Sequence, residues 1–281
     1  SEVPDWQGTF VKDADDAIMR RLKAEKKLVH REKYTHNYPH CWRCESPLIF
    51  RAISTWFVKI EPIKAAMLAA IEQHRPAITY LAYPNNPTAN LFDERSVERI
   101  VVAVGAQDGL VVFDEAYQPF SSRTWMQRMA AHPHVLVMRT LSKFGLAGVR
   151  LGYMAGHAAL VEQIDKVSPP YNVSALNAAA TLFALEHAEV FAEQAAILRR
   201  ERERLSRELA SVAGVTVFPS EANMVLVRVP DSKRTFEGLK SRRILVKHIA
   251  GLHPLLAHCL RLTVGTPEEN TLMIQALKES L

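Results

Sequence analysis

Short apolar runs that alternate with helix-length segments dominate the chain from about residue 63 onward. Runs rich in β-branched and aromatic residues occur at AITYLAY, LVVFDEAY, VLVMRTL and RLGYMAG. The segments between them, such as DERSVERIVVAVGAQD and HAALVEQIDKV, have the pattern of helices. Because strands that alternate with helices form a sheet layered with helices, this part of the sequence predicts an α/β fold.

Two further regions flank this alternation. A long helical stretch is expected from about Ala175 to Val212, followed by the shorter strands VTVFP, NMVLVRV and CLRLTVG and a closing helix, PEENTLMIQALKESL. These elements predict a second, smaller α+β domain. Near the other end, residues 13–33 predict a short helix that opens with aspartates and closes with basic residues, as helix termini favour.

Composition excludes several classes of protein. A chain of 281 residues that is 48% hydrophobic and 23% charged can bury a sizeable core and is not disordered. Its apolar runs are too short and too interrupted for a membrane span, and its start does not resemble a signal peptide. Three cysteines make no disulfide framework, so we expect a cytoplasmic protein. The net charge of +5 is diffuse, which argues against nucleic acid as a partner, and small molecules are the expected partners.

The segment RTLSKFGLAGVRLGY places Lys143 between a strand end and a loop that contains glycine. A lysine that forms a Schiff base must lose its proton near neutral pH, which requires partial burial or a nearby positive charge. Arg150 is a candidate for that charge. Alone, the same pattern is typical of a solvated loop lysine.

Three other segments favour the chemical interpretation. YPNNPTAN brings Asn86 to the end of a strand, and VVFDEAY ends a strand in Asp114 and presents Tyr117 three residues later. A carboxylate that leaves a buried strand needs a cationic or hydrogen-bonding partner, such as a protonated ring nitrogen. CLRLTVGTPEEN carries Arg261 on a strand, and its guanidinium suits a carboxylate or phosphate. Each segment is weak alone, but their order along the chain is specific.

In this order the segments resemble the fold-type I pyridoxal-phosphate aminotransferases, and most closely the histidinol-phosphate aminotransferases, over about residues 63–281. The resemblance implies a large cofactor-binding domain and a smaller α+β C-terminal domain. It implies that Lys143 bonds covalently to pyridoxal 5'-phosphate and that Asp114 pairs with the pyridine nitrogen. The other implied contacts are Asn86 and Tyr117 with the phenolic oxygen, Thr140, Ser142 and Arg150 with the phosphate, and Arg261 with a substrate carboxylate.

The activity implied by this resemblance is transamination between L-histidinol phosphate and 2-oxoglutarate, in histidine biosynthesis, by a homodimer. Two alternatives remain open: a non-catalytic remnant with the aminotransferase fold, and a synthetase-derived module that acts on tRNA or in editing. Two departures from the family stand out. Ala89 replaces the usual glycine after Asn-Pro-Thr, and the spacing of seven from Lys143 to Arg150 is one shorter than in many relatives.

Residues 4–61 resemble a different family, the isoleucyl-tRNA synthetases, in the segment between the editing insertion and the catalytic core. The chain is therefore expected to be a chimeric join. Its predicted parts are a synthetase-like segment at 1–61, an N-terminally truncated large domain at 62–190 and a small domain at 191–281. Because part of the large domain is absent in this interpretation, we expect weaker cofactor binding and weaker dimerisation than in the family.

Cys41 and Cys44 have the spacing of half a zinc knuckle. Only His36, His40 and the distant Cys259 could complete such a site. A free cysteine pair or a broken site is the favoured interpretation, and we predict no metal.

Overall fold

A computed structural model of the chain describes residues 11–28, 64–169 and 172–281. The chain divides into two compact units, Ser1–Arg51 and Ala52–Leu281, and each is considered by itself. The domain boundaries expected after residues 61 and 190 stay predictions. Among the described residues, no helix is both long and apolar enough to cross a membrane.

The first unit contains helix α1, Val11–Ala24. The helix predicted over residues 13–33 is therefore present but begins earlier and ends at Ala24, where a turn follows. In that turn the Glu25 carboxylate accepts hydrogen bonds from Lys27 and Arg21, both at 2.8 Å, which lower its pKa to about 2. The predicted synthetase-like features at Cys41 and Cys44 lie outside the described residues.

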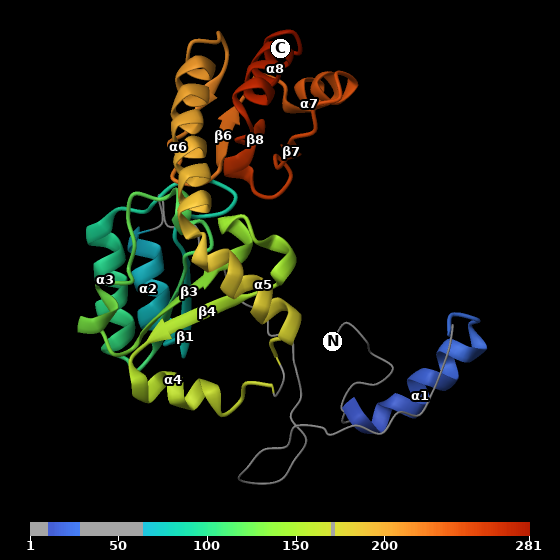
Figure 1. The fold of residues 1–281 in the computed structure, drawn as a ribbon. Coiled ribbons are helices and arrows are strands. Elements are labelled where there is room, and N and C mark those ends of the chain that lie inside the picture. Colours follow the sequence, from blue (N-terminus) through green and yellow to red (C-terminus); the bar gives the residue numbers. More distant parts are fainter. Residues whose placement is uncertain (1–10, 29–63, 170–171) are drawn as a thin grey trace. The chain divides into compact units, whose positions relative to one another are not determined.

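The second unit contains a sheet of four strands in the order β1-β2-β3-β4 (Figure 1). β1, β2 and β3 run parallel, and β4 pairs antiparallel with β3. The bounds are Ile78–Ala82 for β1, Leu110–Asp114 for β2, Val135–Thr140 for β3 and Gly152–Gly156 for β4. The four apolar runs of the sequence thus each contain a strand, and the predicted α/β class is confirmed.

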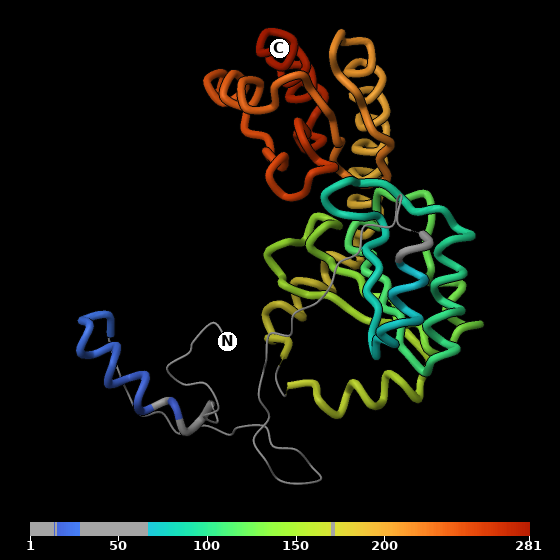
Figure 2. The backbone as a smooth tube through the Cα atoms, turned by 180° about the vertical axis from the view of Figure 1, so that it is seen from behind, coloured from blue at the N-terminus to red at the C-terminus, as the bar shows by residue number. Residues whose placement is uncertain are grey.

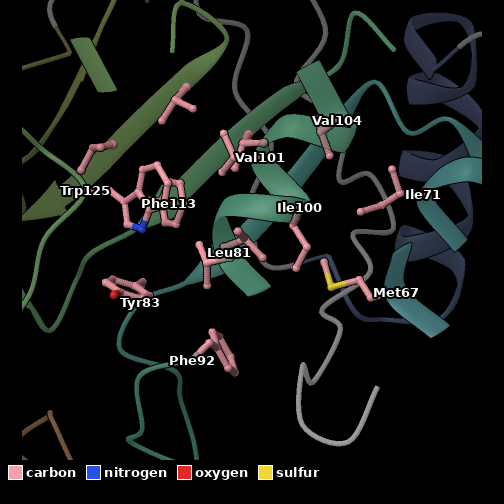
Figure 3. Packing of buried hydrophobic residues seen from close by; sticks show 14 residues of the cluster. Met67, Ile71, Leu81, Tyr83, Phe92, Ile100, Val101, Val104, Phe113 and Trp125 are labelled. Carbon is pink, nitrogen blue, oxygen red and sulfur yellow. The ribbon is translucent and has the colours of Figure 1, made fainter. Parts of the chain in front are cut away.

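Helices α2 (Lys64–His74) and α3 (Glu94–Gly105) pack with this sheet around one hydrophobic core. Figure 3 shows side chains of α2, α3 and the strands meeting in that core. Phe113 of β2 stacks on Trp125 with ring centroids 4.4 Å apart and an interplanar angle of 13°. The loop after β2 is thereby part of the core, because Trp125 is almost fully buried.

The helical stretch expected from Ala175 to Val212 is two helices, α5 (Ala175–Glu186) and α6 (Ala188–Ala210), separated at His187. α5 begins where Ser174 Oγ accepts a hydrogen bond from the amide of Asn177, as an N-cap does. α4 (Ala158–Asp165) precedes them, as predicted. Short 3-10 helices lie at Gln118–Phe120 (η2), Met129–Ala131 (η3), Leu141–Phe144 (η4), Ala147–Val149 (η5) and Pro254–Leu256 (η6).

A second sheet has the order β5-β6-β8-β7, with antiparallel neighbours throughout. Leu205 and Leu209 of α6 share a core with this sheet, with α7 and with the C-terminal helix α8. Sequence patterns did not predict α7 or β7. The bounds are β5 Thr216–Val217, β6 Met224–Arg228, α7 Ser232–Ser241, β7 Lys247–His248, β8 Cys259–Thr263 and α8 Pro267–Lys278.

α6 is the element shared by the two sheets, and Figure 2 shows the chain passing along it from one to the other. Arg199 and Arg202 of α6 donate hydrogen bonds to the backbone of η2, which follows β2 of the first sheet. Further along the helix, Leu205 and Leu209 belong to the core of the second sheet. A single rigid helix therefore carries contacts to both.

A buried ion pair fastens the carboxyl ends of β2 and β3. The Glu115 side chain is fully buried, and its carboxylate accepts hydrogen bonds from Arg139 Nε at 3.0 Å and Nη2 at 2.9 Å. It also accepts from Thr124 Oγ1 and the Trp125 amide, so each carboxylate oxygen has partners. Burial lowers the pKa of Arg139, but its hydrogen bonds to Tyr153 and Glu115 more than offset this, and the net pKa is raised.

We expect Arg139→Met to destabilise the chain strongly. The change leaves the Glu115 carboxylate buried without its cation, which costs about 3 to 5 kcal/mol in comparable sites. Urea unfolding of the purified chain measures the loss, and adding Glu115→Gln to the same chain should recover part of it. Arg242→Met is the control, because it removes an exposed pair with Glu279 and should cost much less. Equal losses for the two arginine variants would contradict the role of the buried pair.

Candidate active site

The ends of three parallel strands place the predicted site residues at one edge of the first sheet. β2 ends at Asp114 and β3 at Thr140, while β1 leads into the loop that carries Asn86. Ligands of open α/β sheets bind at this carboxyl edge. The second sheet contributes one residue, Arg261, from the middle of β8.

Asn86, Tyr117 and Arg261 are linked by hydrogen bonds although they are far apart in sequence. Arg261 Nη1 donates to Asn86 Oδ1 at 2.6 Å, and Asn86 Nδ2 donates to the Tyr117 hydroxyl at 3.4 Å. Arg261 Nε is buried and has no hydrogen-bond partner in the described part of the chain. The guanidinium therefore keeps a donor that a ligand oxygen could satisfy.

Tyr117 lies between groups of opposite charge. Burial raises the pKa of its hydroxyl, Arg261 lowers it and Asp114 raises it, with a net upward shift. The hydroxyl thus stays protonated at neutral pH and can donate a hydrogen bond. Lys143 is exposed, and its ammonium lies 5.5 Å from the centroid of the Tyr117 ring, within the range of a cation–π contact.

The side chain of Asp114 binds the backbone two residues further along the chain. Its Oδ1 accepts a hydrogen bond from the Ala116 amide at 3.0 Å, and the side chain is half-buried. No described donor occupies the other carboxylate oxygen, which leaves it free for a ligand N–H.

The Lys143 turn is short and capped. Thr140 Oγ1 accepts a hydrogen bond from the Ser142 amide at 3.1 Å and donates one to the Leu151 carbonyl at 3.3 Å. Thr140 is therefore the N-cap of η4, and Ser142 lies in its first turn. Gly145 ends it with φ of 102°, a backbone conformation that favours glycine. Arg150 follows at φ 53° with an exposed side chain. Within the described residues, Arg150 makes no hydrogen bond or ion pair with the other predicted site residues.

Ala89 occupies a position that also favours glycine. Its φ is 64°, which costs an ordinary residue about 1 to 2 kcal/mol. Its methyl group is fully buried and packs with Met224 of β6 and with Ala222, which precedes that strand. Burial of one methyl contributes about 0.8 kcal/mol. Packing therefore offsets part of the cost of the departure from the family noted in the sequence.

Sequence reasoning missed the residues that support the site from outside it. Glu115 directly follows Asp114, and Arg139 directly precedes Thr140, so their ion pair holds two predicted residues through the adjoining backbone. The sequence did contain one sign of this ion pair, since Glu115 is a second carboxylate next to Asp114 at the end of a strand. Arg202 and Glu221, which contact the loops of Tyr117 and Asn86, had no such signal.

Comparison with known proteins gives one family. The family model described as aminotransferase class I and II matches residues 21–277. The chain belongs to this family. Its relatives include the histidinol-phosphate aminotransferase of Methylibium petroleiphilum, 69% identical over 214 residues, which cover 76% of this chain and 58% of the relative. The corresponding enzyme of Paracidovorax citrulli is 66% identical over 221 residues, covering 77% of this chain and 60% of that protein.

Solved aminotransferases have the same fold. The histidinol-phosphate aminotransferase of Clostridium acetobutylicum aligns with a TM-score of 0.70 at 20% identity, over 77% of this chain and 66% of that one. The Sinorhizobium meliloti enzyme, solved with pyridoxal 5'-phosphate, aligns with a TM-score of 0.65 at 27% identity, over 77% and 60% respectively. The predicted fold-type I architecture is thereby confirmed. The chain spans about three fifths of the length of the curated relatives it matches.

Within this family fold, Gly145→Ala should destabilise the Lys143 turn. The residue has φ of 102°, and an added Cβ would lie 2.8 Å from Phe191 Cδ1. The conformational cost alone is about 1 to 2 kcal/mol, so the thermal midpoint should fall by roughly 2 to 8 °C. Gly148→Ala is the matched control, since nothing lies within 4 Å of the added atom and the position is not left-handed. A midpoint equally low in both variants would contradict this account of the turn.

Proposed function

We propose that the chain takes part in pyridoxal-phosphate-dependent transamination between L-histidinol phosphate and 2-oxoglutarate, as a cytoplasmic enzyme of histidine biosynthesis. The observation that carries the proposal is the link from Arg261 through Asn86 to Tyr117, at the sheet edge where Asp114 and Lys143 also lie. The relatives named histidinol-phosphate aminotransferase support the choice of amine.

The described residues fit this cofactor. The free oxygen of Asp114 suits a protonated ring nitrogen, and the protonated hydroxyl of Tyr117 and the amide of Asn86 suit a phenolic oxygen. Ser142 and Arg150 offer a hydroxyl and a guanidinium donor for a phosphate, and Thr140 would join them by exchanging its hydrogen bond to the Leu151 carbonyl for one to the phosphate. When bound, pyridoxal 5'-phosphate supplies a ring that accepts the electrons released as the substrate loses its α-proton.

The chain's own residues then have separate tasks. Asp114 keeps a proton on the ring nitrogen, because its charge favours the cationic form. Lys143, exposed beside the Tyr117 ring, holds and returns the proton that moves between substrate and cofactor carbons, as a general base and acid. Arg261 orients a substrate carboxylate with a donor that has no other partner.

We expect pyridoxal 5'-phosphate added to the purified chain to be fixed on Lys143 by borohydride. Reduction followed by peptide mapping locates the label, and an amino-transfer assay with histidinol phosphate and 2-oxoglutarate measures turnover. Lys143→Ala should lose the label and lower turnover roughly 100-fold or more. Lys247→Ala, a change at an exposed lysine of the second sheet, should alter neither.

A label spread over several exposed lysines would contradict the site and favour the alternative of a non-catalytic remnant. A label on Lys143 without turnover of histidinol phosphate, but with turnover of another amine, would retain the cofactor site and reject the substrate.

We further propose that the chain self-associates weakly through α5, with a second copy as the partner. Four apolar side chains of this helix are 45% to 83% exposed: Leu176, Leu182, Phe183 and Leu185. α5 carries only one charged residue, Glu186 at its end. Its partner surface is therefore expected to be apolar as well. A self-complementary pairing of identical faces satisfies both copies at once.

Sedimentation equilibrium should show a weight-average mass that rises with protein concentration. Phe183→Glu should reduce this association at least tenfold, because it places a charge in an apolar interface. Leu245→Glu, at a residue 80% exposed in the other subdomain, is the control and should leave it unchanged. A dimer that does not change with concentration would contradict the weak association.

A further inference from the structure

Arg202 of α6 is a buried cation that no step above uses. Only 8% of the residue is exposed, and Nη1 donates to two carbonyls, Phe120 O at 2.8 Å and Ala222 O at 3.3 Å. Phe120 belongs to η2, the short helix that follows Tyr117, whereas Ala222 precedes β6 of the second sheet. One guanidinium therefore joins the Tyr117 segment to the second sheet.

Backbone contacts carry this junction on to the loop of Asn86. The amide of Glu221, the neighbour of Ala222, donates to Ala89 O at 2.7 Å, and the Glu221 carboxylate accepts the Ser122 amide at 2.7 Å. Ala89, Ala222 and Met224 are buried together, with Tyr117 packed against them. The Asn86 loop, the Tyr117 segment and the start of β6 thus meet at the point that Arg202 holds.

The same elements return to the substrate-binding arginine. In β6, Leu226 lies opposite Arg261 of β8, and Arg261 donates to Asn86 at 2.6 Å. The connection is a closed ring that runs from Arg202 through Phe120, Tyr117, Asn86 and Arg261 and back through β6 to Ala222. Because these contacts form a closed series, the loss of one of them allows the segments on either side of it to shift.

We propose that Arg202 is a positioning residue. Its guanidinium binds the carbonyls of both Phe120 and Ala222 and thereby fixes the positions of Arg261 and Asn86. This inference rests on the proposed function, because it concerns the side of that site which receives the substrate carboxylate. Arg202 contacts none of Asp114, Thr140 or Lys143, so it acts on carboxylate binding and, through Asn86 and Tyr117, on the side of the site that would receive the phenolic oxygen, and not on the groups for the ring nitrogen or the phosphate.

The chemistry of Arg202 is consistent with a fixed position. Burial lowers the pKa of its guanidinium, while the charges of Glu221 and Glu203 raise it and that of Arg199 lowers it. The net effect lowers the pKa, and the guanidinium still remains charged because its ordinary pKa lies far above neutral pH. Lysine at this position would keep the charge but would offer a single point of attachment in place of the planar fork.

The first test is amide hydrogen exchange in the full chain without ligand, at a temperature where every variant is folded by circular dichroism. Arg202→Met should speed exchange of the Phe120 and Ser121 amides, and also of the Ala89 amide, by roughly tenfold, the effect of losing a charge-assisted hydrogen bond. Ala89 decides the matter, because Arg202 does not contact it. Arg202→Lys should give an intermediate rate.

Arg204→Met is the matched control. Arg204 lies on the same helix and bonds Glu201, Glu208 and the Pro267 carbonyl, all away from the ring of contacts. Its loss should lower the thermal midpoint without changing exchange at Ala89. Unchanged exchange at Ala89 in Arg202→Met, or equal acceleration in Arg204→Met, would overturn the inference.

The second test uses glutarate as a dicarboxylate probe, titrated by calorimetry into the chain saturated with pyridoxal 5'-phosphate. Arg202→Met should raise the glutarate dissociation constant roughly tenfold. It should raise the cofactor dissociation constant less, because Asp114, Thr140, Ser142, Arg150 and Lys143 keep their places. Arg261→Met should abolish glutarate binding. Glutarate binding that survives Arg261→Met would reject the proposed function, whereas dependence on Arg261 with tight binding in Arg202→Met would reject the positioning role alone.

Discussion

The Glu115 carboxylate, buried between the ends of β2 and β3, is the interaction on which the site depends. A fully buried charge must have a cation and a complete set of donors, and Arg139, Thr124 and Trp125 supply them. Because Asp114 and Thr140 are the immediate neighbours of this pair in their strands, the pair also fixes the two backbones from which the site side chains project. The stacked rings of Phe113 and Trp125 close the same region from the core side.

Much of the fold could be predicted because buried parallel strands are nearly continuous apolar runs. VVF and VLV each appear as strands in the structure at the positions expected. The break at His187 could not be predicted, since no glycine or proline marks it and both flanking segments are good helix formers. α7 was missed because its residues are mostly polar and it buries only a narrow stripe around Leu239.

The site was predicted in part, and the limit has a physical cause. Local patterns place Asn86, Asp114 and Tyr117 at strand ends, but the contact between Asn86 and Arg261 spans 175 residues and depends on how two sheets meet. Spacing carries no information about such a contact. The strand pattern marked Arg261 as a residue suited to a carboxylate or phosphate, but it did not pair Arg261 with Asn86. Glu115 and Arg139 were missed because, in a sequence, a buried ion pair looks like two ordinary surface charges. The roles assigned to the predicted residues stay predictions.

Helix α6 is a single rod of 23 residues, about 34 Å long at 1.5 Å per residue. Its anchors to the first sheet, Arg199 and Arg202, lie near its middle. Beyond them, Leu205 and Leu209 fix the second half of the rod in the core of the second sheet. A tilt of about 5° about the middle would move the ends by roughly 1.5 Å, so the helix can turn against the first sheet only if that core moves with it.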